Sequence, residues 1–401
     1  MAEIDVYLGH DAQPIFTGRL EKDAHQHAFS YQPHAPEALS LSMPLRVASY
    51  QYPELHPIFQ MNLPEGALRW ALEQMTAKQY GSNDLSLLAL LGRHQIGRLA
   101  YSVAGLPLPA LTEKPLTLDQ LISSTDDDLF AQLLARYATY SGVAGVQPKV
   151  LMPLQQHLTL PLGHYIVKTW AEDYPHLACN EYVCLSIARA AGLEVPHFYL
   201  SDNAKLLITE RFDLTPEGIA LGFEDFGVLQ GKGTKAKYDS SLEACTHTIR
   251  QFVSPSYQTQ ALADFYKLTY LNVRVRNGDA HLKNSGVLYS SLVDYHSGVL
   301  PSIVRKLAPI FDIVSTVPYL PNDTMALLLN GSKRWAKRKM LHQFARQHCG
   351  LSLTRIEQIE GEVEAAIESQ MGLLQSLVER HSGFALVAER MVGVLGKKFE
   401  L

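Results

Sequence analysis

Cysteine is scarce in this chain of 401 residues, which contains four, at Cys179, Cys184, Cys245 and Cys349. Their spacings match neither the pattern of a zinc site nor a dense disulfide framework. We therefore expect reduced cysteines that are buried and behave as small hydrophobic side chains. The sequence does not describe a small secreted domain that depends on disulfides.

Long apolar runs are also absent, since none reaches the roughly 18 residues that a membrane-spanning helix needs. Residues 1–5 lack the positive region and the apolar stretch of a signal peptide. A cytoplasmic protein without a membrane partner is the expectation that follows.

Charge of one sign is not in large excess, because the formal net charge is -5 at pH 7. A protein that is basic over its whole surface is excluded, so any contact with nucleic acid needs a local patch or a partner. One dense basic cluster is present, at residues 333–339. A solvated helix face is its simplest interpretation. Contact with the phosphate backbone of DNA or tRNA is the alternative hypothesis.

The composition that remains is ordinary for a globular protein, with 47% hydrophobic and 19% charged residues. A chain of this length can form two packed lobes. Strand patterns and turns occupy the first part, with a hairpin predicted at 4–8 and 14–20 and a further strand at 39–45. Helical periodicity follows at 65–79 and 86–91.

A proline-rich stretch at 106–117 indicates a linker. Between 141 and 212 the pattern predicts two strands, a helix at 180–191 and two further strands. Beyond residue 213 the longer segments are helical, notably 259–276 and 353–378.

The segment 277–284 carries the strongest chemical signal. It places Asp279 five residues before Asn284, directly after a long apolar helix, which is the spacing of a kinase catalytic loop. Asp279 could accept the proton of an attacking hydroxyl while Asn284 holds a metal ion. Asp279 taken alone would be an ordinary turn residue.

Three further charged residues complete this pattern. Asp312 is the single carboxylate in the apolar, strand-like run 307–314, and its burial is reasonable if it binds magnesium. Lys168 ends a β-branched strand, and Glu181 follows inside the predicted helix. An ion pair between them would hold the lysine on the α- and β-phosphates of ATP.

Two glycines at 141–149 allow backbone to approach phosphate oxygens closely. The pattern Gly-x-Gly-x-x-Gly is absent, and the best Walker-type candidate, residues 227–232, has the wrong spacing. A P-loop NTPase is therefore excluded. The Gly- and Lys-rich segment 224–238 is interpreted as a mobile loop near the active cleft.

The segments 143–149, 166–168, 180–182, 210–213 and 278–284 resemble the HipA family in their residues, order and separation. Two N-terminal segments, 39–46 and 62–66, resemble the accessory subdomain of the same family. The resemblance covers nearly the whole chain.

The resemblance implies an α+β, bilobal, kinase-like fold. Its expected parts are an accessory subdomain at 1–105, a β-rich N-lobe at 106–212 and a helical C-lobe at 213–401. It also implies serine/threonine phosphorylation with ATP and Mg²⁺, a target such as an aminoacyl-tRNA synthetase, and growth arrest or persistence. The implied partner is a HipB-like helix-turn-helix antitoxin, through which operator DNA is contacted indirectly.

Site roles follow from the same resemblance, with Asp279 as the catalytic base and Asn284 and Asp312 on magnesium. Lys168 is expected to bind the phosphates and Glu181 to pair with it. The rest of the nucleotide site is expected to comprise Ala144, Gly145, Val146, Gln147, Pro148 and Lys149 over the phosphates, Glu210, Arg211 and Phe212 at the adenine hinge, and His281 and Phe311. For His281 a hydrogen bond within its own loop is an equal alternative.

One departure from the family concerns self-inactivation. The serine that becomes autophosphorylated in such kinases directly precedes the Val-Ala-Gly segment, and this chain has Gly142 there. Ser141 lies one residue earlier and is the candidate that remains.

Two other functions stay open at this point. A small-molecule phosphotransferase of the aminoglycoside or choline kinase type also has an Asp followed five residues later by Asn. A non-catalytic co-repressor that binds an antitoxin is the third possibility, although it would have no need of Lys168, Asp279, Asn284 and Asp312 together.

Overall fold

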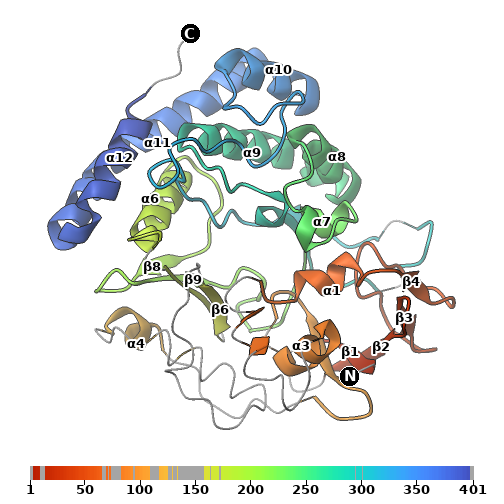
Figure 1. The fold of residues 1–401 in the computed structure, drawn as a ribbon. Helices are drawn as coiled ribbons and strands as arrows, with labels where there is room; N and C mark the ends of the chain where they lie inside the picture. Colours follow the sequence, from red (N-terminus) through yellow and green to blue (C-terminus); the bar gives the residue numbers. More distant parts are fainter. Residues whose placement is uncertain are drawn as a thin grey trace.

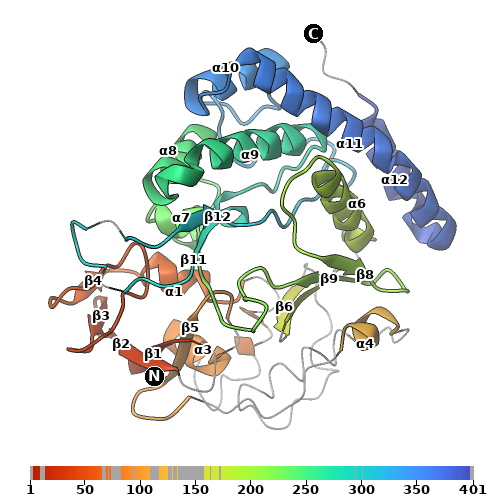
Figure 2. The same ribbon diagram turned by 180° about the vertical axis from the view of Figure 1, so that it is seen from behind.

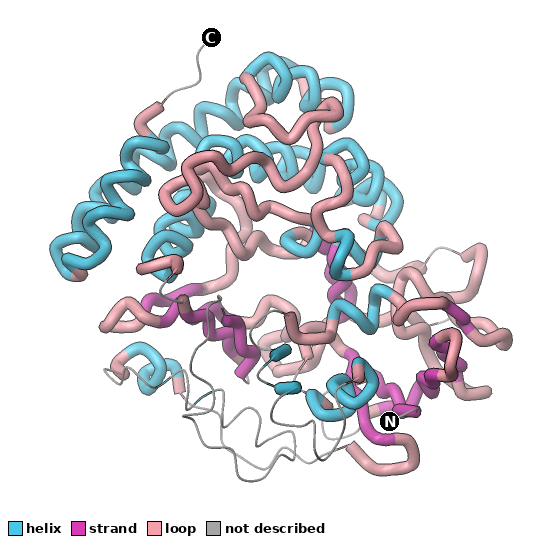
Figure 3. The backbone as a smooth tube through the Cα atoms, in the orientation of Figure 1, coloured by secondary structure: helices cyan, strands magenta, loops and turns pink. Residues whose placement is uncertain are grey.

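The structure is a computed structural model. It describes residues 3–9, 14–65, 69–70, 72–73, 83–93, 95–108, 117–124, 129, 133, 158–162, 164–170, 173–293, 295–299 and 301–397. Helices gather in one half of the molecule and most strands in the other (Figure 3). None of the helices in these segments is long and apolar enough to cross a membrane.

The N-terminal region forms a five-stranded antiparallel sheet in the order β4-β3-β2-β1-β5. Its strands are β1 (Glu3–Leu8), β2 (Ile15–Lys22), β3 (His27–Tyr31), β4 (Tyr50–Tyr52) and β5 (Leu99–Val103). The predicted hairpin is confirmed as β1 and β2. Alternate β1 residues such as Ile4 and Val6 are fully buried, as expected for a strand with one face on a core.

Two short helices accompany this sheet, α1 (Pro57–Met61) and α3 (Asp84–Leu91), and α3 confirms the helix predicted at 86–91. Asn83 caps α3 by accepting from the backbone N–H of Ser86 at 3.0 Å. Of the helix predicted at 65–79, residues 69–70 and 72–73 are described as helical, residue 65 is not, and the rest lies outside the described residues.

The strand predicted at 39–45 is wrong. The segment makes a turn with an isolated bridge between Ser40 and Met43. Its alternating pattern has another cause, because Ser40 and the backbone N–H of Leu41 donate to the buried carboxylate of Glu224, at 2.8 and 2.6 Å. Tyr289 donates to the same carboxylate at 2.6 Å, which ties this turn to the C-terminal half.

A second antiparallel sheet has the order β6-β7-β9-β8. Its strands are β6 (Leu158–Leu162), β7 (Tyr165–Thr169), β8 (Phe198–Leu200) and β9 (Leu206–Glu210). Helix α6 (Leu177–Ala190) connects β7 to β8, and the predicted order of two strands, a helix and two strands is confirmed. A further short helix, α4 (Leu118–Ile122), lies beside this sheet (Figure 1).

The C-terminal half is mainly helical. Its helices are α7 (Phe226–Leu229), α8 (Leu242–Phe252), α9 (Pro255–Arg274), α10 (Arg338–His348), α11 (Leu353–Arg380) and α12 (Ala385–Leu395). The helices predicted at 259–276 and 353–378 are confirmed as α9 and α11. Figure 2 shows α11 crossing the outer side of α9 toward α12, with α6 beside it.

A small sheet, β10-β11-β12, supports the loops between these helices. Its strands are β10 (Gly222–Asp225), β11 (Gly286–Tyr289) and β12 (Arg305–Leu307). The run 307–314 is a strand only as far as Leu307, and farther along the chain Asp312 adopts φ +60°. The loop predicted at 224–238 is also corrected, since it consists of the end of β10, α7 and a 3₁₀ turn at Thr234–Ala236.

The hydrophobic cores do not follow the boundary that we predicted at residue 105. Val167 and Ile208 of the second sheet join Ile4 and the rest of the N-terminal core. Leu207, on the other face of β9, joins the core of α6 and the C-terminal helices. The second sheet thus belongs to two cores. The division of the chain at residues 105 and 212 stays a prediction. All four cysteines are buried and unpaired, as predicted.

His56 is a buried residue at the start of α1. Its Nδ1 accepts from the backbone N–H of Ile58 at 3.3 Å, and its ring lies 4.6 Å from that of Tyr52. Accepting this bond requires the neutral imidazole. Burial lowers the pKa of His56 to about 4.

Acid should therefore destabilise the fold through His56. Its pKa is about 4 when folded and about 6.5 when unfolded, so the unfolded chain binds the proton more readily. Its contribution is present above about pH 6.5 and is lost as the pH falls toward 4. We expect about 2 kcal/mol of this loss between about pH 7.5 and about pH 5. Urea unfolding at both pH values measures it.

The His56→Asn variant keeps a capping side chain but does not titrate, so its stability should fall less over the same interval. The exposed His247 of α8 offers the matched control as His247→Asn. An equal pH dependence in the wild type and His56→Asn would contradict the assignment.

Candidate active site

Lys168 lies on β7, where the side chains alternate between two faces. Its neighbour Val167 enters the N-terminal core, so Lys168 faces α6 and the loop after β12. Its Nζ lies 2.7 Å from Oε1 of Glu181 on α6 and 2.5 Å from Oδ1 of Asp312. The ion pair with Glu181 that we predicted is present, and Asp312 joins it.

Burial alone would lower the pKa of Lys168, but the charges of Asp312 and Glu181 outweigh it and raise the pKa above its ordinary value. The lysine therefore keeps its charge inside the protein. Burial raises the pKa of Glu181 against the opposing effect of this lysine. The Lys168 ammonium has two carboxylate partners, so a phosphate could replace one of them without leaving the cation unpaired.

Asp312 reaches this lysine because of an unusual backbone conformation. Its φ of +60° lies in the left-handed region, which Asp tolerates better than most residues. The apolar residues around it are buried, with Ile310 at 4% and Ile313 at 1% exposure. The apolar run thus reflects the burial of an irregular loop. From sequence alone, such a loop cannot be told apart from a buried β-strand.

The predicted catalytic loop follows α9 and closes on itself through several hydrogen bonds. Asn277 accepts from the backbone N–H of Asp279 at 3.1 Å, and the backbone N–H of His281 donates to the carbonyl of Asp279 at 2.8 Å. Nδ2 of Asn284 donates to the same carbonyl at 3.0 Å and to the carbonyl of Asp312 at 3.4 Å. Asp279, Asn284 and Asp312 are therefore brought together.

Gly278 lies close to the side chain of Asp323. A Cβ at this position would clash with the Asp323 carboxylate, which would have to move. Its backbone N–H donates to Oγ1 of Thr316 at 2.9 Å, and this hydroxyl also bonds to Asp323. Any larger side chain would push the loop away from this support.

These residues open into a cleft of about 900 Å³. Its wall is formed on one side by the N-terminal residues 61–65 and on the other by the C-terminal residues 278–279 and 311–312. This volume lies near the upper end of the range for small-molecule pockets, which is large enough for a nucleotide.

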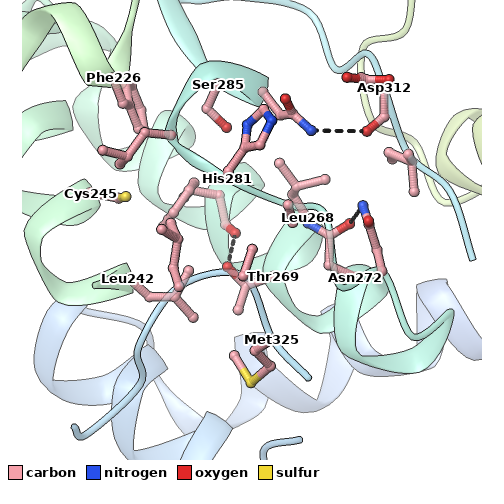
Figure 4. A pocket seen from close by; sticks show the side chains of 18 of the residues that line it. Phe226, Leu242, Cys245, Leu268, Thr269, Asn272, His281, Ser285, Asp312 and Met325 are labelled. Atoms are coloured by element: carbon pink, nitrogen blue, oxygen red, sulfur yellow. Dashed lines mark hydrogen bonds between the residues drawn. The ribbon is translucent and has the colours of Figure 1, made fainter. Parts of the chain in front are cut away.

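A smaller pocket of about 40 Å³ lies behind the cleft and shares His281 and Asp312 with it. Figure 4 shows His281 on one side of this pocket and the apolar side chains of Phe226, Leu242 and Cys245 on the other. Burial lowers the pKa of His281. Its Nδ1 is buried without a hydrogen-bond partner among the described residues, and its Nε2 lies 3.9 Å from Oδ1 of Asp279 in the same loop.

The arrangement fits a magnesium ion that is shared with phosphates. No group of three or more His, Cys, Asp or Glu residues in the described part of the chain could hold a metal alone. Asn284 and Asp312 are adjacent, and because Nδ2 of Asn284 is engaged, its Oδ1 is the atom left for a cation. Magnesium commonly takes one or two protein oxygens and completes its shell with phosphate and water.

The side chains predicted at the adenine hinge have partners within the protein. Arg211 donates to Asp213 at 2.6 Å, and Phe212 stacks on Phe311 with centroids 4.9 Å apart. Glu210 accepts from Tyr199 at 3.3 Å. A hinge at these residues would use their backbone, and this role stays a prediction.

The predicted phosphate loop lies outside the described residues. This applies to Ala144, Gly145, Val146, Gln147, Pro148 and Lys149, and to the phosphosite candidate Ser141.

Two residues of the cleft were missed in the sequence. Tyr238 donates a hydrogen bond of 2.5 Å to Oδ1 of Asp279, although no motif marks it. Glu65 pairs with Lys237 at 3.1 Å and with Lys283 of the predicted catalytic loop. Burial would raise the pKa of Glu65, but both lysines outweigh it and lower the pKa. In the sequence, Glu65 is marked only by the resemblance of segment 62–66 to the family.

The basic cluster at 333–339 has partners inside the protein. Lys333 donates to the backbone carbonyl of Tyr238 at 3.0 Å, and Arg338 pairs with the buried Glu360 at 2.8 Å. Lys337 and Lys339 remain exposed.

Comparison with known proteins places these features in a family. Residues 5–102 match the HipA N-terminal domain, and residues 141–371 match the HipA-like C-terminal domain. A relative from Sinorhizobium fredii (strain NBRC 101917 / NGR234), named "Putative kinase Y4dM", is 30% identical over 304 residues, which cover 70% of this chain and 67% of the relative.

A second relative is the "Serine/threonine-protein kinase toxin HipA" of Shewanella oneidensis, which is 28% identical over 167 residues, or 39% of this chain and 37% of that protein. Among solved structures, a chain of the complex of HipA, HipB and operator DNA from Shewanella oneidensis MR-1 superimposes with a TM-score of 0.69. It covers 98% of this chain and 96% of that chain at 16% identity, and so it supports the fold alone.

The resemblance and the α+β kinase-like fold predicted from the motifs are confirmed. A family of kinases implies the use of ATP. With its N-terminal and C-terminal domains both matched, the chain belongs to the HipA family of kinases.

Proposed function

We propose that this protein is an ATP-dependent serine/threonine protein kinase that acts as a toxin of the HipA type. The observation that carries the proposal is that Asp279 and Asp312 line one cleft, with the buried Lys168 in contact with Asp312 and a hydroxyl already bonded to Asp279. Phosphoryl transfer needs a cation on the phosphates and a carboxylate on the acceptor hydroxyl.

In this proposal the nucleotide end of the cleft is organised by Lys168. Its ammonium binds the α- and β-phosphates and gives up its contact with Asp312, while Glu181 keeps it in place. Residues 144–149 cover the phosphates, residues 210–212 hold the adenine, and His281 and Phe311 complete the nucleotide site. Asn284 and Asp312 hold magnesium, which neutralises charge on the phosphoryl group when it is bound.

The acceptor end is organised by Asp279. Partial burial raises the pKa of this carboxyl, which makes its ionised form a stronger base than an Asp at its ordinary pKa. It takes the proton of a serine or threonine hydroxyl as the oxygen attacks the γ-phosphorus. The backbone bonds within 277–284 fix its orientation, so no reorganisation is needed at the moment of transfer.

Glu65 acts here as a positioning residue. It holds Lys283, which directly precedes Asn284, and Lys237, which directly precedes Tyr238. Through these lysines one carboxylate of the N-terminal domain sets the distance between the catalytic loop and the opposite wall of the cleft.

For the biological role, we propose a HipB-like antitoxin as partner, with operator DNA contacted indirectly, in the cytoplasm. The similarity to a chain from a complex of HipA, HipB and operator DNA supports this. The proposed target is a translation component such as an aminoacyl-tRNA synthetase, whose phosphorylation would cause growth arrest or persistence.

Kinase activity is tested with purified protein, γ-labelled ATP, magnesium and a heat-treated cell lysate. We expect label in one or a few proteins, and a loss of about 100-fold or more in Asp279→Asn because the base is removed. The exposed Asp202→Asn should label like the wild type. Label that appears only in small metabolites would identify a small-molecule phosphotransferase, and no label would identify a non-catalytic binding protein.

Toxicity is tested by inducing the protein without its antitoxin. The wild type should slow growth, and Asp279→Asn should not, because arrest requires phosphorylation. Coexpression of a small helix-turn-helix protein encoded in the adjacent reading frame should restore growth. Equal arrest by the wild type and Asp279→Asn would exclude a kinase toxin.

The positioning role is tested with Glu65→Gln, which keeps the shape but removes the charge. We expect the rate of protein labelling to fall roughly tenfold, mainly in kcat, because the catalytic loop loses its anchor. Glu54→Gln, an exposed substitution in the same domain, is the matched control. If both variants label at the wild-type rate, Glu65 does not position the loop.

A further inference from the structure

Tyr238 occupies a distinctive place beside the catalytic base. It follows the 3₁₀ turn at Thr234–Ala236, and its hydroxyl lies 2.5 Å from Oδ1 of Asp279. Its ring packs edge-on against His281, with centroids 5.1 Å apart at 76°. The side chain is therefore held on two sides, while 39% of the residue remains exposed.

This is the geometry that a phosphoryl acceptor requires. A base must lie within hydrogen-bond reach of the hydroxyl whose proton it takes. Burial, together with the nearby charge of Asp279, raises the pKa of the Tyr238 phenol, so the hydroxyl keeps its proton until a base removes it. Among the hydrogen bonds of the described residues, Tyr238 supplies the hydroxyl that meets Asp279.

The donor end of the cleft is close to the same hydroxyl. Asn284 donates to the carbonyls of both Asp279 and Asp312, and Asp312 contacts Lys168 at 2.5 Å. A triphosphate bound by Lys168 would extend toward Asp279, to which the hydroxyl of Tyr238 is hydrogen-bonded. Tyr238, Asp279 and Asp312 all line the cleft, and Lys168 contacts it through Asp312.

We propose that Tyr238 is a modification site of this chain, phosphorylated in cis by its own kinase centre. The inference rests on the proposed kinase function. The phenolic oxygen of Tyr238 attacks the γ-phosphorus of ATP, and an O–P bond forms as the bond from that phosphorus to the bridging oxygen breaks. ADP leaves with the electron pair of the broken bond, and the phenolic proton passes to Asp279.

The surroundings can accommodate the product. A phosphate on Tyr238 would be repelled by the carboxylate of Asp279, and the exposure of the ring leaves it room to turn outward. Nζ of Lys237 lies 5.4 Å and Nζ of Lys333 6.0 Å from the ring centroid. Two cations therefore flank the side chain where the new negative charge would appear.

The test uses the full-length protein with γ-labelled ATP and magnesium, in the absence of any other protein. Peptide mass spectrometry should locate phosphotyrosine at Tyr238. The amount of phosphate on this peptide should fall to background in Tyr238→Phe and Asp279→Asn. Tyr257→Phe is the matched control and should leave the modification unchanged, because Tyr257 is similarly exposed, at 36%, but lies beside Lys306 and not beside a base.

The reaction order separates a reaction within one chain from one between chains. Transfer in cis predicts that the initial rate of phosphorylation per protein molecule stays the same over a roughly hundredfold dilution. A rate per molecule that rises with protein concentration would overturn the proposal. Wild-type protein that labels lysate proteins but carries no phosphate on Tyr238 would overturn this inference and leave the kinase function standing. No labelling of any kind would overturn both. Equal thermal midpoints of wild type and Tyr238→Phe exclude misfolding as the cause of a loss.

Discussion

The buried ammonium of Lys168 is the point on which the rest of the structure depends. It draws together β7, helix α6 through Glu181, and the loop after β12 through Asp312. Buried ions are costly unless each has a partner with good geometry, so these three elements must converge. Because the lysine has two carboxylates and a nucleotide brings further negative charge, one carboxylate has to leave or gain a cation of its own. Asp312 is the more exposed of the two.

The N-terminal domain takes part in this arrangement at two places. Its turn at Ser40 and Leu41 donates to the buried Glu224, and Glu65 reaches across the cleft to the predicted catalytic loop. The first contact joins the domain to the small sheet below the loop, and the second joins it to the loop itself. What resembles an accessory domain in sequence is thus part of the wall of the active cleft.

Prediction from sequence succeeded where a signal is local. Helices α9 and α11 have long apolar periodicity, and the five-residue spacing of Asp279 and Asn284 lies within one loop. It failed where a local pattern has a non-local cause. At 39–45 the hydroxyl of Ser40 is bonded to the distant Glu224, and the apolar residues around Asp312 line an irregular loop.

Two contacts between distant segments, Glu65 with Lys283 and Tyr238 with Asp279, have no signal in the sequence. Glu65 and Lys283 are 218 positions apart, and neither residue type is unusual in its own segment. Tyr238 ends the segment 224–238, which the sequence predicted to lie near the active cleft, but only the folded chain brings its hydroxyl to Asp279.

The sheet that serves two cores has an evolutionary consequence. Val167 belongs to the N-terminal core, and the next residue is the lysine that we assign to the nucleotide. A change of volume in the N-terminal core beside Val167 would therefore displace Lys168, its neighbour in the chain. Exchange of this domain between relatives would mismatch the packing beside Lys168. We expect substitutions in the two halves to be coupled where they pack across the second sheet.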